Sequence, residues 1–258
     1  MKRFALLLLP LLIAGVALGA SDGRKEKLAE ERASSAVGMP AGTESTNDGW
    51  LRLTPEVSGY DYRSFQVMPS GVIWLTGFNT TSNLDYVWRS NNGGATWTRN
   101  ATGTSAGITG IAARNDTLAV VGTVLGSLLR TTNGGAKWDS VYYYGAGSGF
   151  FDGVYWVGGD TAIAFGDNDG TGFLVVRSTD AGATWTRLTN IPALASAASY
   201  SYLTYRQPGD FYGNTLWITA YTGSGTAPVI LKTTDRGETW TDWAVTLPGG
   251  LSNNYYFR

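Results

Sequence analysis

The sequence contains no cysteine and no histidine, and only 15% of its 258 residues are charged. Without cysteine, disulfides, thiol catalysis, lipoprotein attachment and zinc–thiolate sites are excluded. Without histidine, the commonest general base and the commonest metal ligand are missing, so Ser–His–Asp chemistry is impossible within this chain. The net charge of −1 gives no electrostatic footprint for nucleic acid or for an anionic membrane.

Aromatic residues and glycine are abundant instead. The chain has 10 tryptophans, 14 tyrosines and 35 glycines. Aromatic side chains favour strands, and glycine favours the tight turns between them. This composition predicts short β-strands joined by turns.

The N-terminal segment has the features of a secretory signal. A basic start (Lys2, Arg3) precedes the apolar run "FALLLLPLLIAGVALG", which ends in small residues. We predict a signal peptide over residues 1–20, a flexible tether over 21–48, and a protein secreted to the periplasm, the cell surface or the medium. The proline in the run and the charged residues that follow disfavour a membrane-spanning helix, so no span should remain after cleavage; an uncleaved anchor is the alternative.

A ten-residue pattern occurs four times, as "WRSNNGGATW", "LRTTNGGAKW", "VRSTDAGATW" and "LKTTDRGETW". Its final tryptophans are spaced by 41, 47 and 55 residues. Repeats of this size are typical of solenoids and propellers. Each period contains four strand-like runs separated by turn signals, which is the unit of a β-propeller blade. The sequence therefore predicts an all-β propeller of four-stranded antiparallel blades, at about residues 60–100, 107–142, 148–190 and 200–246.

From residue 50 to 258, these repeats resemble the Asp-box family, also called bacterial neuraminidase repeats. They are most similar to secreted bacterial proteins of the type IX secretion cargo kind, and less similar to sialidase-like glycosidases and photosystem II assembly factor propellers. The resemblance implies that the pattern is the hairpin between the third and fourth strands of each blade. Glycine would supply the backbone angle, Asp or Asn and Ser or Thr would bond the turn's amides, and Trp would pack beneath.

Two copies of the pattern carry Asn where the other two carry Asp, and an amide cannot act as a general acid. We therefore interpret the aspartates as structural rather than catalytic. The structural residues predicted in this way are Ser90, Asn92, Gly94, Trp97, Thr131, Asn133, Gly135, Trp138, Ser178, Asp180, Gly182, Trp185, Thr233, Asp235, Gly237 and Trp240.

The two ends of the repeat region indicate how a ring would close. The segment "DGWLRLT" resembles "ATWTRLT" of the third repeat, so residues 49–55 are predicted to form a fourth strand that closes the ring. The terminal "NNYYFR" resembles the opening of the first blade. We expect four complete blades of a six- or seven-bladed ring that is monomeric when complete. The alternative is a self-contained four-bladed ring.

The loops opposite the Asp-box turns hold the candidate ligand residues. In "GDNDGTG", Asp167 and Asp169 alternate as in a calcium loop, but the distal acidic ligand is missing, and a turn that solvates two carboxylates explains the segment equally well. We therefore expect no cofactor, with Ca²⁺ at this pair as the exception. Tyr221, in the loop "AYTGSGTAP", is a further ligand-binding candidate.

Arg63 is the other candidate. Sialidases carry a Phe/Tyr-Arg-Ile-Pro motif on the first inner strand, and "YRSF" matches its first two residues but not its last two. The resemblance implies that Arg63 would hold a substrate carboxylate, with Asp85 where that family places its general acid. Against this, an inner-strand arginine can pair with a carboxylate or line the channel without any ligand.

Three functions remain open. The first is a secreted module without catalysis that binds carbohydrate or an extracellular protein, because no complete acid–base or nucleophile set is recognisable. The second is a glycoside hydrolase, which needs two carboxylates across a cleft; Asp85, Asp152, Asp167 and Asp169 are available. The third is an assembly factor, which should carry a basic patch that the sequence does not indicate.

Overall fold

The computed structural model describes residues 59–105, 107–145, 150–168, 171–192, 198–200, 209–222 and 227–244. The predicted signal peptide, tether and closing strand lie outside the described residues. All described residues belong to one unit of the chain, Leu53–Arg258. Within them every regular element is a strand, and no helix is present that could cross a membrane.

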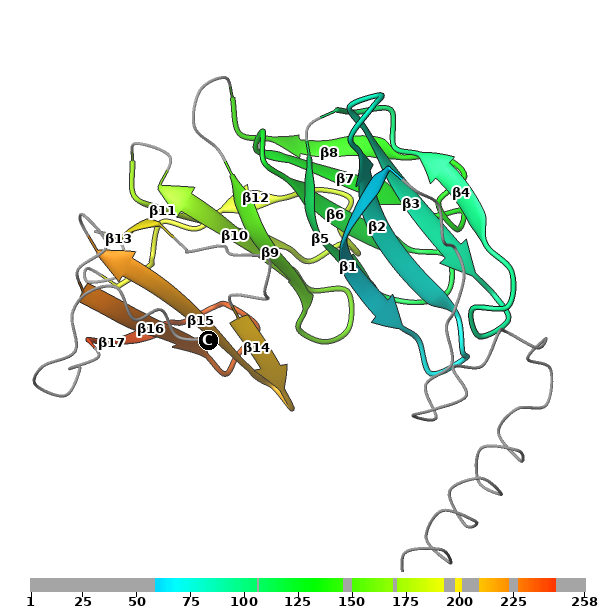
Figure 1. The fold of residues 1–258 in the computed structure, drawn as a ribbon. Helices are drawn as coiled ribbons and strands as arrows, with labels where there is room; N and C mark the ends of the chain where they lie inside the picture. Colours follow the sequence, from blue (N-terminus) through cyan, green and yellow to red (C-terminus); the bar gives the residue numbers. More distant parts are fainter. Residues whose placement is uncertain are drawn as a thin grey trace, which may run out of the picture. The chain divides into compact units, whose positions relative to one another are not determined.

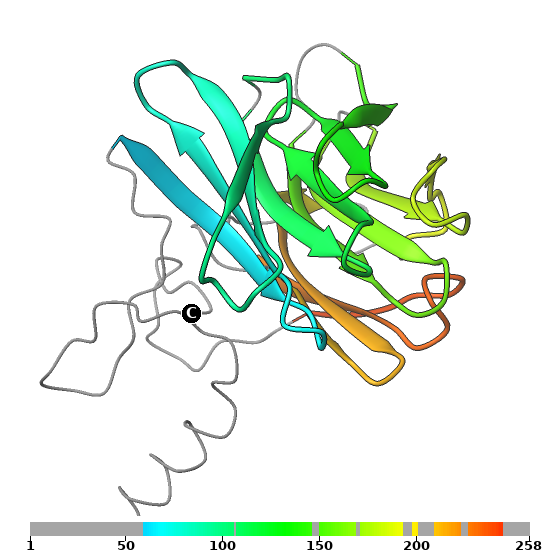
Figure 2. The same cartoon turned by 90° about the vertical axis from the view of Figure 1, so that its right-hand side faces the viewer.

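The strands form four antiparallel sheets (Figure 1), also visible after a quarter turn (Figure 2). The first sheet contains β1 (Tyr60–Val67), β2 (Ile73–Asn79), β3 (Leu84–Ser90) and β4 (Thr98–Ala101). The second contains β5 (Ile108–Ala113), β6 (Ala119–Thr123), β7 (Ser127–Thr131) and β8 (Asp139–Tyr143). The third contains β9 (Phe151–Trp156), β10 (Ala162–Asn168), β11 (Phe173–Ser178) and β12 (Thr186–Arg187). One such sheet per repeat confirms the predicted all-β class.

The fourth sheet differs because its innermost position is shared by two strands. It contains β13 (Ala198–Tyr200), β14 (Gly209–Tyr212), β15 (Thr215–Thr222), β16 (Ala227–Thr233) and β17 (Thr241–Ala244). β14 pairs with the first half of β15, and β13 pairs with its last residues. The expected continuous strand "SYLTYR" (201–206) lies outside the described residues.

The strands in the middle sheets are buried on both faces. β6 ("AVVGT") is buried at every position, and so are the first four residues of β11 ("FLVV"). Continuous apolar runs of this kind are expected where a sheet has neighbours on both sides. Three apolar clusters fill the spaces between consecutive sheets, and their largest buried side chains include Trp74, Phe151 and Phe165.

Arginines in the Asp-box pattern join neighbouring sheets. Arg89 donates from Nε to the carbonyl of Asp116 at 2.7 Å, Arg130 to that of Ala181 at 2.8 Å, and Arg177 to that of Arg236 at 2.7 Å. We call these three the interface arginines. Each lies on the third strand of one sheet and donates to the main chain of the next sheet along the sequence. The same contact therefore joins each sheet to its successor.

Candidate functional site

Each sheet has two distinct ends. At the first, the third strand leads into the fourth through the Asp-box pattern, and we call this the box end. At the other, which we call the entry end, the inner strands β1, β5 and β9 begin, as the antiparallel register shows. The predicted structural residues lie at the box end, and the candidate ligand residues Arg63, Asp85 and Asp167 lie toward the entry end.

The box-end turns share one hydrogen-bond pattern. In the fourth sheet, Thr233 Oγ1 accepts from the Gly237 amide at 2.8 Å, and Asp235 Oδ1 accepts from the Thr239 amide at 2.9 Å. Gly237 has φ +82°, which L side chains rarely adopt, and Trp240 Nε1 donates to its carbonyl at 3.2 Å. The first three sheets repeat the Ser/Thr and Asp/Asn bonds at Ser90, Asn92, Thr131, Asn133, Ser178 and Asp180.

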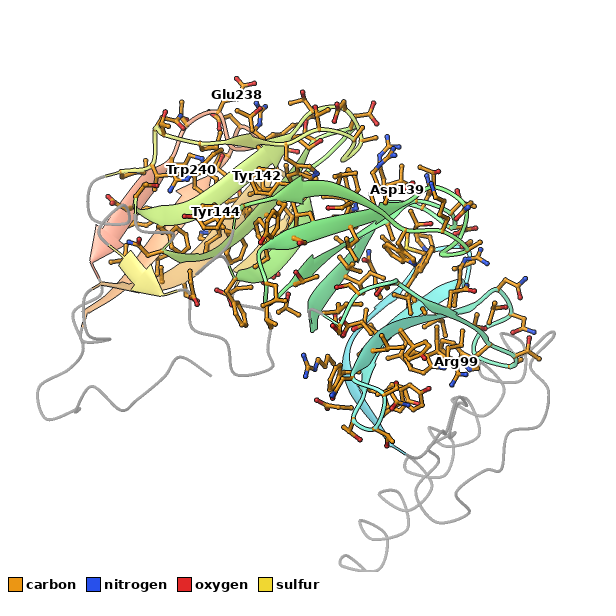
Figure 3. All side chains as sticks on the ribbon, turned by 90° about the horizontal axis from the view of Figure 1, so that it is seen from above. Arg99, Asp139, Tyr142, Tyr144, Glu238 and Trp240 are labelled. Atoms are coloured by element: carbon orange, nitrogen blue, oxygen red, sulfur yellow. The ribbon has the colours of Figure 1, made fainter. Side chains whose placement is uncertain are left out.

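Tryptophan follows this pattern in three turns of four. Trp97 and Trp185 also donate to the glycine carbonyl three residues back, at 2.9 and 3.0 Å. The indole nitrogen of Trp138 is buried and finds no hydrogen-bond partner among the described residues. Its ring instead packs edge-on against Trp74 of the first sheet. Figure 3 labels Trp240 and Glu238 in the fourth-sheet turn.

The box-end aspartates are held ionised by their own turns. Partial burial alone would raise the pKa of Asp180, but hydrogen bonds from Thr184, Ser178 and Ala183 lower this pKa to about 2. Asp235 is similar: against the effect of burial, bonds from Thr239, Thr233 and Glu238 lower its pKa to about 2. A carboxylate that accepts this many hydrogen bonds is stabilised in its charged form. These side chains organise a turn and have little capacity left for a ligand.

Asp85 is fully buried and ties the first sheet to the second. Its two oxygens accept from the amides of Gly107 at 2.8 Å and Ile108 at 3.0 Å, at the start of β5. Burial raises its pKa, although these two hydrogen bonds and the Arg63 charge act in the opposite direction. The carboxylate therefore anchors the loop that enters β5 rather than facing solvent.

Arg63 lies beside this anchor on β1. Its Nε is 3.2 Å from an oxygen of Asp61, its Nη1 donates to the Ile108 carbonyl at 3.3 Å, and its guanidinium lies 5.4 Å from the Phe78 ring centre. The side chain remains partly exposed. The structure thus places Arg63 and Asp85 near each other, with Arg63 as the member that can still reach a ligand.

A β-bulge recurs at the same place on every inner strand. The register skips Arg63 in β1, Thr109 in β5, Asp152 in β9 and residue 199 in β13. A bulge turns the extra residue out of the ordinary alternation and is common next to binding sites. We call Arg63, Thr109 and Asp152 the bulge residues. They place a guanidinium, a hydroxyl and a carboxyl at equivalent positions of three adjacent sheets.

Asp152 is a site residue that the sequence offered only as one of four carboxylates available to a hydrolase. It is 3% exposed, and neither carboxyl oxygen has a hydrogen-bond partner among the described residues. Burial, and to a smaller extent the negative charge of Asp167, raises the pKa of Asp152 well above 3.8. Aligning the inner strands as "YRSF", "ITGI" and "FDGV" would have revealed it, because each has a different polar residue before a small one.

Gly166 brings Asp167 close to this position. A Cβ atom at Gly166 would lie only 1.6 Å from the Phe150 carbonyl oxygen, so a side chain there would block the approach of the segment entering β9. The Asp167 amide donates to the same oxygen at 3.0 Å. The main chain therefore fixes Asp167 beside the beginning of β9, which carries Asp152.

For the other two predicted ligand residues, Asp169 and Tyr221, no side-chain position is described. Asp169 lies outside the described residues. Tyr221 belongs to β15, but its side chain is not described. No group of three or more acidic side chains that could hold a metal is found in the described part of the chain. The predicted pairing of Asp167 with Asp169 is therefore untested, while the pairing of Asp167 with Asp152 rests on described residues.

No protein-family model matches the sequence, and no curated protein is significantly similar to it. Among solved structures, YCF48 from Cyanidioschyzon merolae is similar with a TM-score of 0.50 and 17% identity, covering 76% of this chain and 60% of that one. A Penicillium chrysogenum alpha-L-arabinanase complexed with arabinobiose gives 0.45 and 12%, covering 76% and 69%. A Trypanosoma rangeli sialidase in complex with sialic acid gives 0.44 and 14%, covering 79% and 40%.

These likenesses concern the fold alone, because the identities are low. Together with the four antiparallel sheets, the similarity to YCF48 confirms the predicted β-propeller fold. The chain spans about six tenths of the length of the YCF48 structures. Kinship with type IX secretion cargo stays a prediction.

Proposed function

We propose that this protein is a secreted β-propeller that acts as a binding or scaffolding module for carbohydrate or protein, without catalysis of its own. The observation that carries the proposal is the alignment of the three bulge residues toward the entry end. Binding sites typically combine a rigid framework with a few polar groups of different chemistry. The inner strands supply the framework, and the bulges supply an Arg, a Thr and an Asp.

Exposed aromatic side chains on β1 support a carbohydrate or peptide ligand. Phe65, two residues after the bulge at Arg63, is 67% exposed, and Tyr62 is also exposed. Aromatic rings with one open face stack on sugar rings or on peptide side chains. A guanidinium beside them adds hydrogen-bond donors for hydroxyl, carboxylate or carbonyl groups.

The test is a glycan array followed by a screen of purified surface proteins, with two matched variants. Arg63→Ala should abolish binding to any ligand found, because it removes the only positively charged bulge residue among Arg63, Thr109 and Asp152, and its side chain is partly exposed. Lys137→Ala removes one positive charge at the box end and should leave binding unchanged. Equal binding by both variants and the wild type would show that the ligand does not use Arg63, which would overturn the site proposed on β1.

Export is part of the proposal and is supported by residues 1–20 alone. Expression of the full chain in a Gram-negative host should yield a processed form outside the cytoplasm. Mass spectrometry should place its N-terminus near residue 20. An unprocessed protein that stays in the cytoplasm would contradict secretion.

Glycoside hydrolysis is the second candidate function, favoured by the raised pKa of Asp152 and by its neighbour Asp167. A protonated carboxyl beside a second one is the arrangement that general acid catalysis uses. We rank it second because a carboxyl that is 3% exposed must be uncovered before it can contact a substrate. Hydrolysis of aryl glycosides by the wild type, lost in Asp152→Asn, would reverse this ranking.

A further inference from the structure

We propose that a hard metal cation of the Ca²⁺ class binds between Asp152 and Asp167, toward the entry end of the third sheet. This site shares Asp152 and Thr109 with the bulge residues of the proposed function, but a cation can fill it whether or not a glycan or protein partner is bound. It also differs from the pairing of Asp167 with Asp169 that the sequence indicates.

The first argument is the placement of the two carboxyl groups. The bulge in β9 leaves Asp152 outside the ladder between β9 and β10. Asp167 is held at the end of β10 by the bond from its amide to the Phe150 carbonyl, just before β9 begins. The close approach at Gly166 fixes these two segments together. Asp152 and Asp167 therefore each follow one member of the paired residues Phe151 and Gly166, and the negative charge of Asp167 acts on the Asp152 carboxyl.

The second argument is that Asp152 is buried without a partner. A buried carboxyl normally accepts hydrogen bonds or pairs with a positive charge, because its desolvation is otherwise uncompensated. Neither of its oxygens has a hydrogen-bond partner among the described residues. In contrast, Asp85, at the same end of the first sheet, binds two amides. A cation would supply what Asp152 lacks.

The neighbouring strand offers a third oxygen at the equivalent position. Thr109 is the bulge residue of β5, which packs beside β9. Its Oγ1 is also buried without a hydrogen-bond partner among the described residues. Two adjacent bulges therefore each carry a polar oxygen whose bonding capacity is unused.

The donor set selects the kind of ion. It consists of oxygens only, and the chain has neither histidine nor cysteine to attract a softer metal. Ca²⁺ accepts about six to eight oxygen ligands from carboxylates, carbonyls, hydroxyls and water in adaptable geometry. A divalent charge would also neutralise two carboxylates that repel each other when both are ionised.

The experiment measures cation binding to the full chain without any glycan or partner. Thermal unfolding is followed at pH 7 in EDTA and in about 1 mM CaCl₂, and Tb³⁺ luminescence sensitised by tryptophan reports direct binding. A ligand that binds only the folded state raises the Tm. We expect Ca²⁺ to raise the Tm of the wild type, and Tb³⁺ to luminesce and be displaced by Ca²⁺.

Three variants locate the effect. Asp152→Asn and Asp167→Asn should both lose the Ca²⁺-dependent rise in Tm and the displaceable Tb³⁺ signal. Asp139→Asn removes an exposed carboxylate at the box end and should keep both. If Asp152→Asn fails to fold, Asp167→Asn alone decides.

The proposal is overturned if the wild type has the same Tm in EDTA and in CaCl₂ and shows no displaceable Tb³⁺ signal. It is also overturned if the folded Asn variants respond like the wild type. In the first case Asp152 is a lone buried acid, and in the second the ion binds elsewhere. Neither result bears on the glycan array, so the proposed function and the cation site can fail separately.

Discussion

The box end and the entry end give the same side chain opposite properties. At the box end, Asp235 is partly exposed, accepts hydrogen bonds from Thr233, Glu238 and Thr239, and has its pKa lowered to about 2. At the entry end, Asp152 is buried, accepts none from the described residues, and has its pKa raised well above 3.8. The number of donors around an aspartate therefore separates a structural turn from a candidate site better than its presence in a motif.

The two ends also differ in how glycine shapes the main chain. Each box-end turn closes on its own residues, with glycine in a left-handed conformation. The entry end of the third sheet depends on two segments touching at a glycine in ordinary strand geometry. Substitutions at one end should therefore affect stability differently from substitutions at the other.

The largest effect is expected from Gly166→Ala. Its Cβ would lie 1.6 Å from the Phe150 carbonyl oxygen, so the segment entering β9 must move. We expect a loss of more than about 3 kcal/mol of unfolding free energy, or no soluble protein. Gly110→Ala, where no atom lies within 4 Å, should change stability by less than about 1 kcal/mol. Urea denaturation of both variants tests this, and equal midpoints would contradict the close approach.

The next largest effect is expected from Arg130→Ala. It removes a charge-assisted hydrogen bond of 2.8 Å to the Ala181 carbonyl, which joins the second sheet to the third. The loss should be about 1.5–3 kcal/mol of unfolding free energy. Lys232 occupies the same position in the fourth sheet and lies 6.0 Å from the Trp217 ring centre, a contact worth about 1 kcal/mol or less. If Lys232→Ala is as costly as Arg130→Ala in chemical denaturation, the contact between sheets is not the cause.

Asp152→Asn should stabilise the protein in EDTA at pH 7. Because burial raises the folded pKa above 3.8, the carboxyl favours folding below pH 3.8, and this contribution is lost as the pH rises through the folded pKa. The amide cannot ionise, so its gain of about 1–2 kcal/mol at pH 7 should vanish below about pH 4. Unfolding free energies measured across this range test the sign. A variant that is less stable at pH 7 would show that the carboxylate has a partner.

The smallest effect, of opposite sign, is expected from Asp235→Asn. The folded pKa of about 2 lies below 3.8, so the carboxylate contributes stability above pH 3.8 that is lost as the pH falls through about 2. Because the side chain is partly exposed, the cost at neutral pH should stay below about 1 kcal/mol. The converse change, Asn133→Asp, should be neutral or slightly stabilising at pH 7. A large loss in Asp235→Asn would show that the amides at Asn92 and Asn133 are not equivalent replacements.

The repeated pattern was enough to predict the box-end turns and the all-β class, because the residues of each turn interact within one hairpin. Glycine at Gly237, acceptors at Thr233 and Asp235 and an indole at Trp240 all act within one hairpin. The bulges could not be predicted in this way, since a register shift depends on pairing with a neighbouring strand. Thr109 was therefore missed, and Asp152 was noticed only as one of four available carboxylates.

The roles of Arg63 and Asp85 needed distances that the sequence does not contain. Their separation of 22 residues fits the sialidase resemblance, but the structure uses both Asp85 oxygens to bind the amides before β5. Burial of the Asp85 carboxylate depends on how the first sheet packs on the second, which no local pattern encodes.

The interface arginines have a consequence for how the repeats diverge in evolution. Each one donates a hydrogen bond to a main-chain carbonyl oxygen, and the accepting residues are an aspartate, an alanine and an arginine. The contact between blades therefore does not depend on the acceptor's side chain, and the accepting residue can be replaced while the contact survives. Duplicated copies need to keep only the donor and the turn, which explains how repeats of such different length and loop composition share one frame.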